Sequence, residues 1–267
     1  MLFVWWSIAL LAIFLIGVTK SGFGSGVGLM IVPMMALSMS HVPERGTEAA
    51  LGMLLPLLVA GDLIAVYQYR HLFSMKIVRK LLPGTLLGVV IGMTVLWWFA
   101  TQEKEVADAL IRIEIGLESM LLVGLHWWRS SREKDDGIYQ PKAWQSAVVG
   151  AFAGASSTIA HAAGPIITLY LLPQRLERQL YVGTNALYFF LLNTIKLPAY
   201  YQAGQFAKAS PQFSLMFLPV VIAGAFTGIW LNRRVSDALF SKIVYALTFV
   251  LGLYVPIDGG IKLGRHL

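Results

Sequence analysis

The sequence predicts an all-α polytopic membrane protein made of two inverted repeats, and three observations lead to this fold class. Hydrophobic residues make up 57% of the chain and charged residues only 13%, against about 25% charged in soluble domains. Five stretches contain no Asp, Glu, Lys or Arg: 1–19, 21–43, 81–102, 143–174 and 209–232. A glycine-rich break also interrupts apolar sequence twice, at 20–28 and at 154–165.

Ten apolar segments follow one another along the chain. They cover 2–19, 25–39, 47–66, 82–100 and 107–128 in the first half, and 144–160, 164–172, 180–201, 212–231 and 240–256 in the second. A spanning helix needs about 20 apolar residues, so the short segments 25–39 and 164–172 are expected to be half-helices or re-entrant arms. The first segment lacks a basic start and is followed by Lys20, so it is expected to be a membrane helix, not a signal peptide.

The basic residues predict the orientation of the chain. Twelve Lys or Arg fall in the loops near 67–80, 129–143, 173–179 and 232–239, and five fall in the alternating loops and the C-terminal tail. Because positive loops stay in the cytoplasm, we expect a multi-pass protein of the plasma (inner) membrane with both termini external. This explains the net charge of +7 without a nucleic-acid partner.

Five segments per half is an odd number, so the second half is expected to lie upside down relative to the first. The predicted units are a first transmembrane repeat over 1–128, a cytoplasmic linker over 129–143 and a second transmembrane repeat over 144–267. Each repeat contains one broken or re-entrant helix pair. The alternative is that polytopic proteins simply carry glycines at similar places.

The two breaks supply the candidate binding residues. Unwound backbone at membrane depth occurs only where protein buries it or where it lines a cavity, and helix N-termini attract anions. We therefore expect a pocket for a small oxyanion formed by Lys20, Ser21, Gly22, Gly24, Ser25 and Gly26 with Ser156, Ser157, Thr158, His161, Gly164 and Pro165. Close helix packing by small residues is the alternative.

Several ionisable residues interrupt the apolar segments. Lys20 is expected either to attract the anion or to snorkel to an interface. Asp62 is a candidate partner for Lys20, a proton carrier or a capped structural acid, and Asn193 and Lys196 are weaker candidates in the corresponding segment. Proton coupling is assigned to Asp62, Glu118 or His161. Arg112, paired with Asp108, and Glu114 are expected to extend an exposed helix end.

Other chemistry is not indicated by the sequence. Without cysteine, and with five scattered histidines, we expect no metal site and no cofactor. The chain has no phosphate-binding loop of the Gly-x-x-x-x-Gly-Lys-Ser/Thr type, so it does not use ATP by itself. A secondary transporter is the favoured class, a passive anion channel is the alternative, and an enzyme is not expected.

Two segments resemble those of a known family. Residues 17–26 followed by Val32-Pro33, and Gly164-Pro165 through Leu171-Leu172-Pro173-Gln174-Arg175 to Gly183-Thr184, resemble the repeat signatures of the TauE/SafE sulfite-exporter family. Here Ala162-Ala163-Gly164, preceded by His161, replaces the usual second glycine run. The resemblance implies a permease that exports small sulfur oxyanions or organosulfonates, such as sulfite or sulfoacetate. The expected partners are this anionic substrate and the lipid bilayer, with homo-oligomer formation left open.

Overall fold

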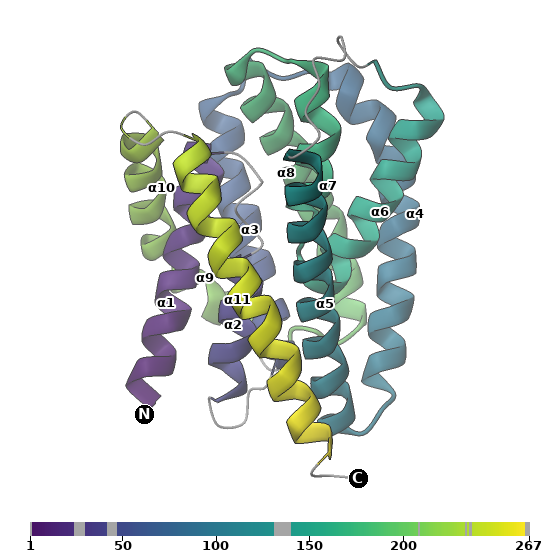
Figure 1. The fold of residues 1–267 in the computed structure, drawn as a ribbon, viewed down its shortest axis with the longest axis vertical. Coiled ribbons are helices and arrows are strands. Elements are labelled where there is room, and N and C mark those ends of the chain that lie inside the picture. Colours follow the sequence, from purple (N-terminus) through teal and green to yellow (C-terminus); the bar gives the residue numbers. More distant parts are fainter. Residues whose placement is uncertain are drawn as a thin grey trace.

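The computed structural model describes residues 2–23, 30–41, 47–130, 140–207, 209–232, 234 and 237–264. Within these ranges the regular elements are all helices (Figure 1): α1 (Leu2–Val18), α2 (Ile31–Ser40), α3 (Thr47–Gln68), α4 (Met75–Ala100), α5 (Lys104–Ser130), α6 (Ala143–Ala160), α7 (Ala163–Leu171), α8 (Arg178–Gln202), α9 (Pro211–Leu215), α10 (Leu218–Asn232) and α11 (Asp237–Gly264). A π-helical turn, Thr19–Phe23, continues α1, and a short 3₁₀ turn, Leu172–Gln174, follows α7. Both termini lie at the same end of the molecule (Figure 1).

Each predicted apolar segment contains a helix, with three main differences in its limits. Helix α11 continues to Gly264, beyond the predicted end at residue 256. The predicted segment 212–231 is divided into α9 and α10, which meet near Met216. Helix α4 begins at Met75, before the predicted start at residue 82. The residues missed there include Lys76, Arg79 and Lys80, whose charges hide the helix from a search for apolar sequence although each has a good helix propensity.

The helix lengths separate spanning helices from half-helices. Phe3–Ser21, Ala49–Gln68 and Met75–Phe99 are long and apolar enough to cross a membrane. Helices α2 and α7 contain 10 and 9 residues, which at 1.5 Å per residue reach about 15 Å. This is half of the roughly 30 Å of a bilayer core, so neither crosses by itself.

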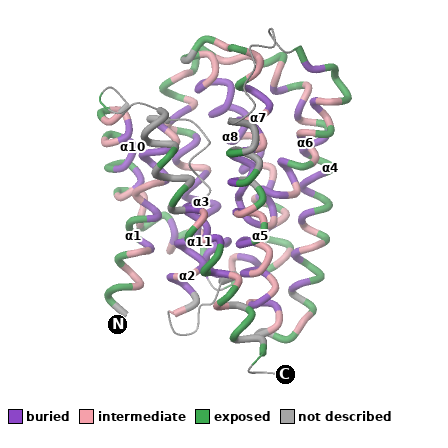
Figure 2. The backbone as a smooth tube through the Cα atoms, viewed as in Figure 1, coloured by how far each residue is buried: buried purple, intermediate pink, exposed green. Residues whose placement is uncertain are grey.

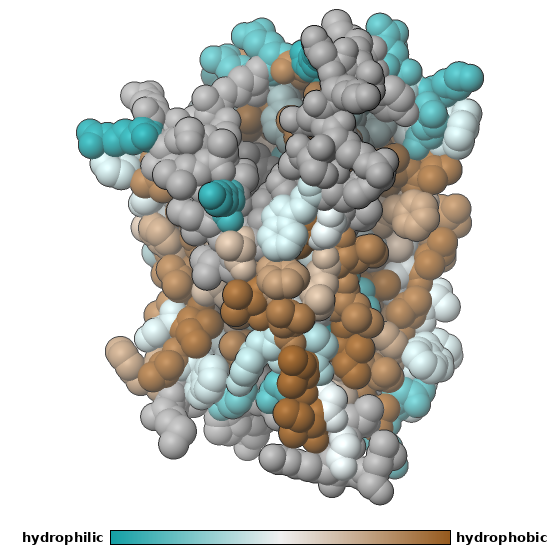
Figure 3. Space-filling model, viewed as in Figure 1, coloured by the Kyte–Doolittle hydropathy of each residue, from teal (hydrophilic) through white to brown (hydrophobic). Residues whose placement is uncertain are grey.

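The outer surface is apolar around the middle of the molecule. Figure 3 shows a hydrophobic band between an end with hydrophilic side chains and an end of mixed character. Large apolar side chains are exposed on this surface, among them Phe3, Leu87, Val90, Phe152 and Phe226, and Figure 2 shows exposed and buried residues alternating along the outer helices. Apolar exposure of this extent is expected where lipid replaces water.

Four helix pairs make the most extensive contacts: α4 with α6, α5 with α11, α1 with α10, and α3 with α8. Glycines bring α4 and α6 together, and also α1 and α10. A Cβ at Gly84 or Gly88 would overlap the backbone of Ala147 or Ala151 on α6, and one at Gly224 would overlap Phe14 on α1. Small residues at such crossings let helix backbones approach closely in membranes.

The two breaks lie between packed helices. The first starts with the π-helical turn after α1 and resumes at α2, while Gly24, Ser25 and Gly26 lie outside the described residues. In the second, His161 adopts a left-handed conformation with φ 51° between α6 and α7. Pro33 and Pro165 are the third residues of α2 and α7, where a proline costs no intrahelical hydrogen bond. Each break therefore separates a long helix, α1 or α6, from a short one, α2 or α7.

Candidate functional site

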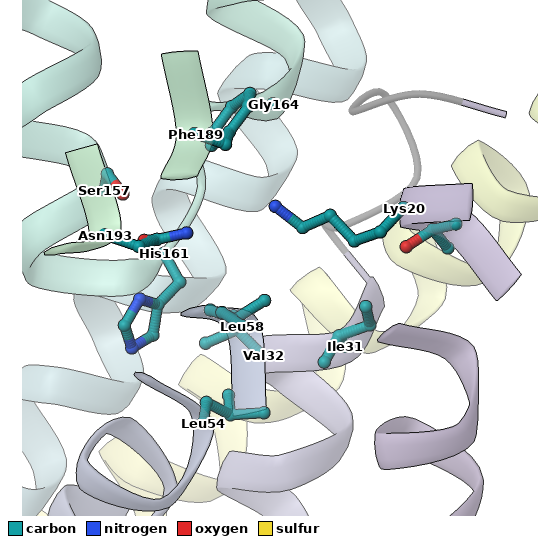
Figure 4. Close-up of a pocket in the computed structure, with 11 residues that line it drawn as sticks. Lys20, Ile31, Val32, Leu54, Leu58, Ser157, His161, Gly164, Phe189 and Asn193 are labelled. Carbon is teal, nitrogen blue, oxygen red and sulfur yellow. The ribbon is translucent and has the colours of Figure 1, made fainter. Parts of the chain in front are cut away.

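A small pocket lies where the two breaks meet. Its walls come from the π-helical turn after α1 (Thr19, Lys20), the start of α2 (Ile31, Val32), α3 (Leu54, Leu58), the second break (Ser157, His161, Gly164) and α8 (Phe189, Asn193). Figure 4 shows Lys20 extending into it from one side, with Ser157, His161 and Asn193 on the other. The pocket encloses about 30 Å³, the volume of about one water molecule. Between the described residues there is room for little more than one water molecule, so an oxyanion requires the walls to move apart.

Lys20 is held at this pocket by two neighbouring helices. Its Nζ lies 2.6 Å from Asp62 Oδ1 on α3, in an ion pair that is not aligned as a hydrogen bond. The same Nζ lies 4.4 Å from the centre of the Phe189 ring on α8, within the range of a cation–π interaction. The Lys20 side chain keeps 12% exposure whereas that of Asp62 is fully buried. The positive charge therefore faces the pocket and its counter-ion lies behind it.

Asn193 joins this ion pair to the second half of the chain. Its Nδ2 donates a hydrogen bond of 2.6 Å to Asp62 Oδ2, so both carboxylate oxygens of Asp62 are engaged. The sequence predicts three alternative roles for Asp62, one of them a partner of Lys20. The structure shows this pairing. Because Asp62 compensates Lys20 inside the protein, an anion that binds Lys20 competes with an internal carboxylate.

The second break is fixed by Lys196, which is fully buried. Its Nζ donates to Ser157 O and Ser157 Oγ, both at 2.8 Å, and lies 3.0 Å from His161 Nδ1. On the other side of the imidazole ring, His161 Nε2 lies 3.1 Å from the carbonyl oxygen of Leu51. A carbonyl only accepts, so Nε2 carries the proton and the Nδ1 lone pair faces the ammonium.

The same lysine lies at the C-terminal end of α6, where carbonyl groups lack helical partners and the helix dipole is negative. Lys196 binds the carbonyl of Ser157, which also accepts from the His161 backbone N–H, and the Tyr200 hydroxyl donates to the carbonyl of Thr158. Lys196 does not line the pocket. Its contacts are those of a cation that stabilises the break, whereas Lys20 is the cation that faces the pocket.

Two half-buried glutamates on α5 form a separate cluster. Glu114 and Glu118 interact with each other, and Glu118 also interacts with the Ser156 hydroxyl on α6. Oε2 of each glutamate and Ser156 Oγ are buried without a well-formed hydrogen bond among the described residues. Tyr200 on α8 lies within electrostatic reach of Glu114. A buried carboxyl oxygen that lacks a hydrogen-bond donor favours the protonated form of the group.

The expectation that Arg112 extends an exposed helix end is wrong. Arg112 is only 2% exposed. It pairs with Asp108 at 2.7 Å, as predicted, and also with Asp258 on α11. The partner that allows its burial lies 146 residues further along the chain, and no local pattern indicates it. Glu114 is likewise not at an exposed end.

The structure places the predicted binding residues in three groups. Lys20, Ser157, His161 and Gly164 line the pocket. Ser21, Ser156, Thr158 and Pro165 lie in the same breaks without lining it: Ser21 is buried, Thr158 Oγ1 donates to Gly154 O inside α6, and Ser156 faces Glu118. Gly22 lies in the π-helical turn that follows α1. Gly24, Ser25 and Gly26 lie outside the described residues. Thr19 and Phe189, which line the pocket, carry no charge that marks them in sequence.

A cluster of His, Asp and Glu suited to a metal ion does not occur among the described residues. The N-terminal ends of α2 and α7 both contribute to the pocket through Ile31, Val32 and Gly164. Helix N-termini and a pocket-facing lysine supply positive potential, and Ser157 and Asn193 supply polar groups that donate hydrogen bonds. The site is therefore suited to a small anion.

An apolar helical exterior around a small, cation-bearing pocket at two helix breaks is typical of a polytopic membrane transport protein. The family model described as sulfite exporter TauE/SafE matches residues 9–255, so the chain belongs to this family of membrane transporters. The comparisons with curated proteins and with solved structures give no match.

Proposed function

We propose that the protein is a secondary transporter that exports small sulfur oxyanions or organosulfonates, of which sulfite and sulfoacetate are examples. The observation that carries this proposal is the pocket-facing ammonium of Lys20 opposite Ser157, His161 and Asn193. An oxyanion there accepts from Lys20 and from the Ser157 hydroxyl, whose oxygen already accepts from Lys196 and whose proton remains to donate. Membership in the sulfite exporter family supports the same substrate class.

We also propose that the two halves are inverted repeats. In this arrangement α1, α2, α3, α4 and α5 correspond, in order, to α6, α7, α8, α10 and α11. The packing supports this, because exchanging each helix with its counterpart converts the α4–α6 pair into the α10–α1 pair. The same exchange converts α1–α2 into α6–α7 and leaves the α3–α8 and α5–α11 pairs unchanged. Residues 1–128 and 144–267 then form the two repeats on either side of the linker, and their relative rocking alternates access to the pocket.

Orientation follows from the positive-inside rule as before, with the linker in the cytoplasm and both termini external. The position of both termini at one end of the molecule agrees with this arrangement (Figure 1). In the plasma membrane the inside-negative potential contributes about 2.3 kcal/mol per charge per 100 mV, which favours the exit of an anion. Export therefore needs no ATP.

Protons are proposed to couple to transport through Glu118, rather than through Asp62 or His161. Both oxygens of Asp62 and both ring nitrogens of His161 already have partners. Glu118 has a buried oxygen without a well-formed hydrogen bond and faces Ser156, next to the pocket-lining Ser157. A proton arriving at Glu118 changes the charge beside the second break and leaves the charge of the pocket-facing Lys20 unchanged.

A binding screen of the purified protein tests the site. Sulfite, sulfate, thiosulfate, sulfoacetate, taurine and simple carboxylates are compared by thermal shift, with Ser157→Ala and with Thr194→Val as the matched control. Thr194 lies on α8 beside Asn193 but is exposed on the outer surface. Stabilisation by a sulfur oxyanion that Ser157→Ala weakens and Thr194→Val preserves supports the proposal. Equal stabilisation in both variants places the anion elsewhere.

Flux measurements separate the transporter from the passive anion channel. In proteoliposomes a transporter with alternating access shows saturable sulfite efflux that external sulfite accelerates, because the loaded site returns faster than the empty one. A channel shows a conductance that rises with concentration and no such acceleration. The small volume of the pocket, about 30 Å³ between the described residues, supports the transporter.

A further inference from the structure

A second, open groove lies at one end of the molecule, far along α6 from the pocket. It is lined by Lys76, Arg79, Lys80 and Pro83 of α4 and by Ala143, Trp144 and Ala147 of α6, and it has a volume of about 660 Å³. Lys76, Arg79, Lys80 and Pro83 occupy positions i, i+3, i+4 and i+7, so they lie on one face of α4. The groove therefore runs between the first turns of two helices that come from different halves of the chain.

The positive charges of this groove form no salt bridge among the described residues. The cations that do form salt bridges in that part of the chain are Lys20 and Arg112, and both lie outside the groove. Lys76 and Arg79 are exposed. Lys80 Nζ donates a hydrogen bond of 3.2 Å to the carbonyl oxygen of Pro141, which leaves its charge uncompensated. The groove thus offers three cations to an anionic ligand.

The groove continues into the apolar outer surface. Leu86, Leu87 and Val90 follow on α4, and Val148 and Phe152 follow on α6, each with its side chain exposed. Trp144 is 64% exposed at the boundary between the charges and this apolar surface, the position that tryptophan favours at a membrane interface. A ligand that fits the whole surface has an anionic head and long apolar chains.

We propose that this groove binds the headgroup of an anionic phospholipid, such as phosphatidylglycerol, from the surrounding bilayer. The phosphate contacts Lys76 and Arg79 between α4 and α6, and the acyl chains lie along the apolar faces below. Basic pockets between transmembrane helices bind such headgroups elsewhere. A soluble phosphate would use the cations but not the apolar surface, so we assign the site to lipid.

The position of the groove gives the lipid a structural effect. Helices α4 and α6 already pack closely, because Gly84 and Gly150 leave no room for a Cβ between them. A headgroup that bridges their first turns holds the first half of the chain to the helix that ends at the second break. Bound lipid is therefore expected to stabilise the folded protein by mass action.

Native mass spectrometry and thermal melting of the detergent-solubilised protein test this proposal. Phosphatidylglycerol is expected to bind and to raise the melting temperature, and phosphatidylcholine and inorganic phosphate are not. The Lys76→Gln/Arg79→Gln variant removes two cations and leaves the Lys80 contact with Pro141 in place. It is expected to weaken phosphatidylglycerol binding about 30-fold.

The matched control is Arg70→Gln/Arg234→Gln, which removes the same charge from two loops predicted to lie on the same side of the membrane but outside the groove. Equal weakening in this control overturns the site, because it indicates a general charge effect. Stabilisation by inorganic phosphate alone overturns the assignment to lipid.

A second readout in the wild-type protein covers the case in which the variant does not fold. Phosphatidylglycerol with brominated chains is expected to quench the Trp144 fluorescence, measured as the difference between the wild type and Trp144→Phe, more than brominated phosphatidylcholine does. Equal quenching by the two lipids overturns the proposal.

Discussion

The ammonium of Lys20 and the carboxylate of Asp62 form an ion pair of 2.6 Å that joins the π-helical turn after α1 to α3. The two groups differ in exposure, because Asp62 is fully buried and Lys20 reaches the pocket. A buried ion pair contributes little net stability, but removing one partner leaves an uncompensated charge. This asymmetry lets stability and anion binding be tested separately.

Lys20→Ala is expected to lower the free energy of unfolding by about 3–5 kcal/mol, because it leaves the buried Asp62 carboxylate without its cation. The double variant Lys20→Met/Asp62→Asn removes both charges, so it is expected to recover most of this loss. Unfolding in mixed micelles measures the effect. The double variant is expected not to bind sulfite, and recovered folding together with full binding would show that Lys20 does not bind the anion.

Lys196→Met is expected to lower stability without removing anion binding. It leaves the Ser157 hydroxyl and His161 Nδ1 without their donor, at a cost of about 1–3 kcal/mol for each buried group left unpaired. Because Lys196 does not line the pocket, the protein that remains folded is expected to bind sulfite within a few-fold of the wild type. Calorimetric titration measures the affinity, and loss of binding comparable to that of Lys20→Met/Asp62→Asn would make Lys196 a substrate ligand.

The contrast between these two lysines shows what the sequence could predict. Lys20 lies inside a glycine-rich break, so local sequence was sufficient to single it out. Lys196 lies in a long apolar segment, and its contacts with Ser157 and His161 cross 39 and 35 residues of sequence. Only the packing of α8 against the second break brings these groups together. The burial of Arg112 against Asp258 was missed for the same reason.

The helices themselves were predictable because a bilayer fixes both their length and their composition. The predicted limits were poorest where a helix extends beyond the apolar zone, as α4 does at Lys76 and Arg79. Charge then marks the interface and not the end of the helix. For the pocket, sequence reasoning found the breaks but not the lining residues of α3 and α8, such as Leu54 and Phe189. These are apolar residues in apolar helices, and only tertiary contact distinguishes them.

His161 is expected to be a neutral imidazole with its proton on Nε2. The carbonyl of Leu51 lies on the Nε2 side and the Lys196 ammonium on the Nδ1 side, and only this tautomer satisfies both. Nitrogen-15 NMR of histidine-labelled protein distinguishes the two ring nitrogens. A protonated Nδ1 would contradict the prediction, and Lys196→Met is expected to release the preference because it removes the neighbour that fixes Nδ1.

Gly84→Ala is expected to destabilise the protein by about 1–3 kcal/mol, the usual cost of overpacking. The added Cβ would overlap the Ala147 backbone, so α4 and α6 have to separate. Gly124 on α5 is the matched control, because a Cβ there meets nothing within 4 Å. Gly124→Ala is expected to leave stability unchanged or to raise it by about 0.5–1 kcal/mol. Comparable losses in the two variants would argue against the close α4–α6 contact.

Glu118→Gln is expected to remove the dependence of sulfite efflux on a pH gradient. The reason is that Glu118 has a buried oxygen without a well-formed hydrogen bond and faces Ser156 beside the pocket. Its titratable neighbour is Glu114 on the same helix, and Glu114 in turn lies within electrostatic reach of Tyr200 on α8. Glutamine keeps the shape of the side chain but cannot exchange a proton. Efflux from proteoliposomes at equal and unequal pH measures the effect.

The control for this experiment is Glu177→Gln, which changes an exposed carboxylate immediately before α8. It is expected to keep the wild-type response, so that a loss in Glu118→Gln cannot come from removing any acidic residue. If the wild type itself does not respond to a pH gradient, the membrane potential alone drives export. If Glu118→Gln still responds, the proton is carried elsewhere. The next variant to measure is then Asp62→Asn combined with Lys20→Met. It removes the charge of Asp62, the acid that pairs with the pocket-lining Lys20.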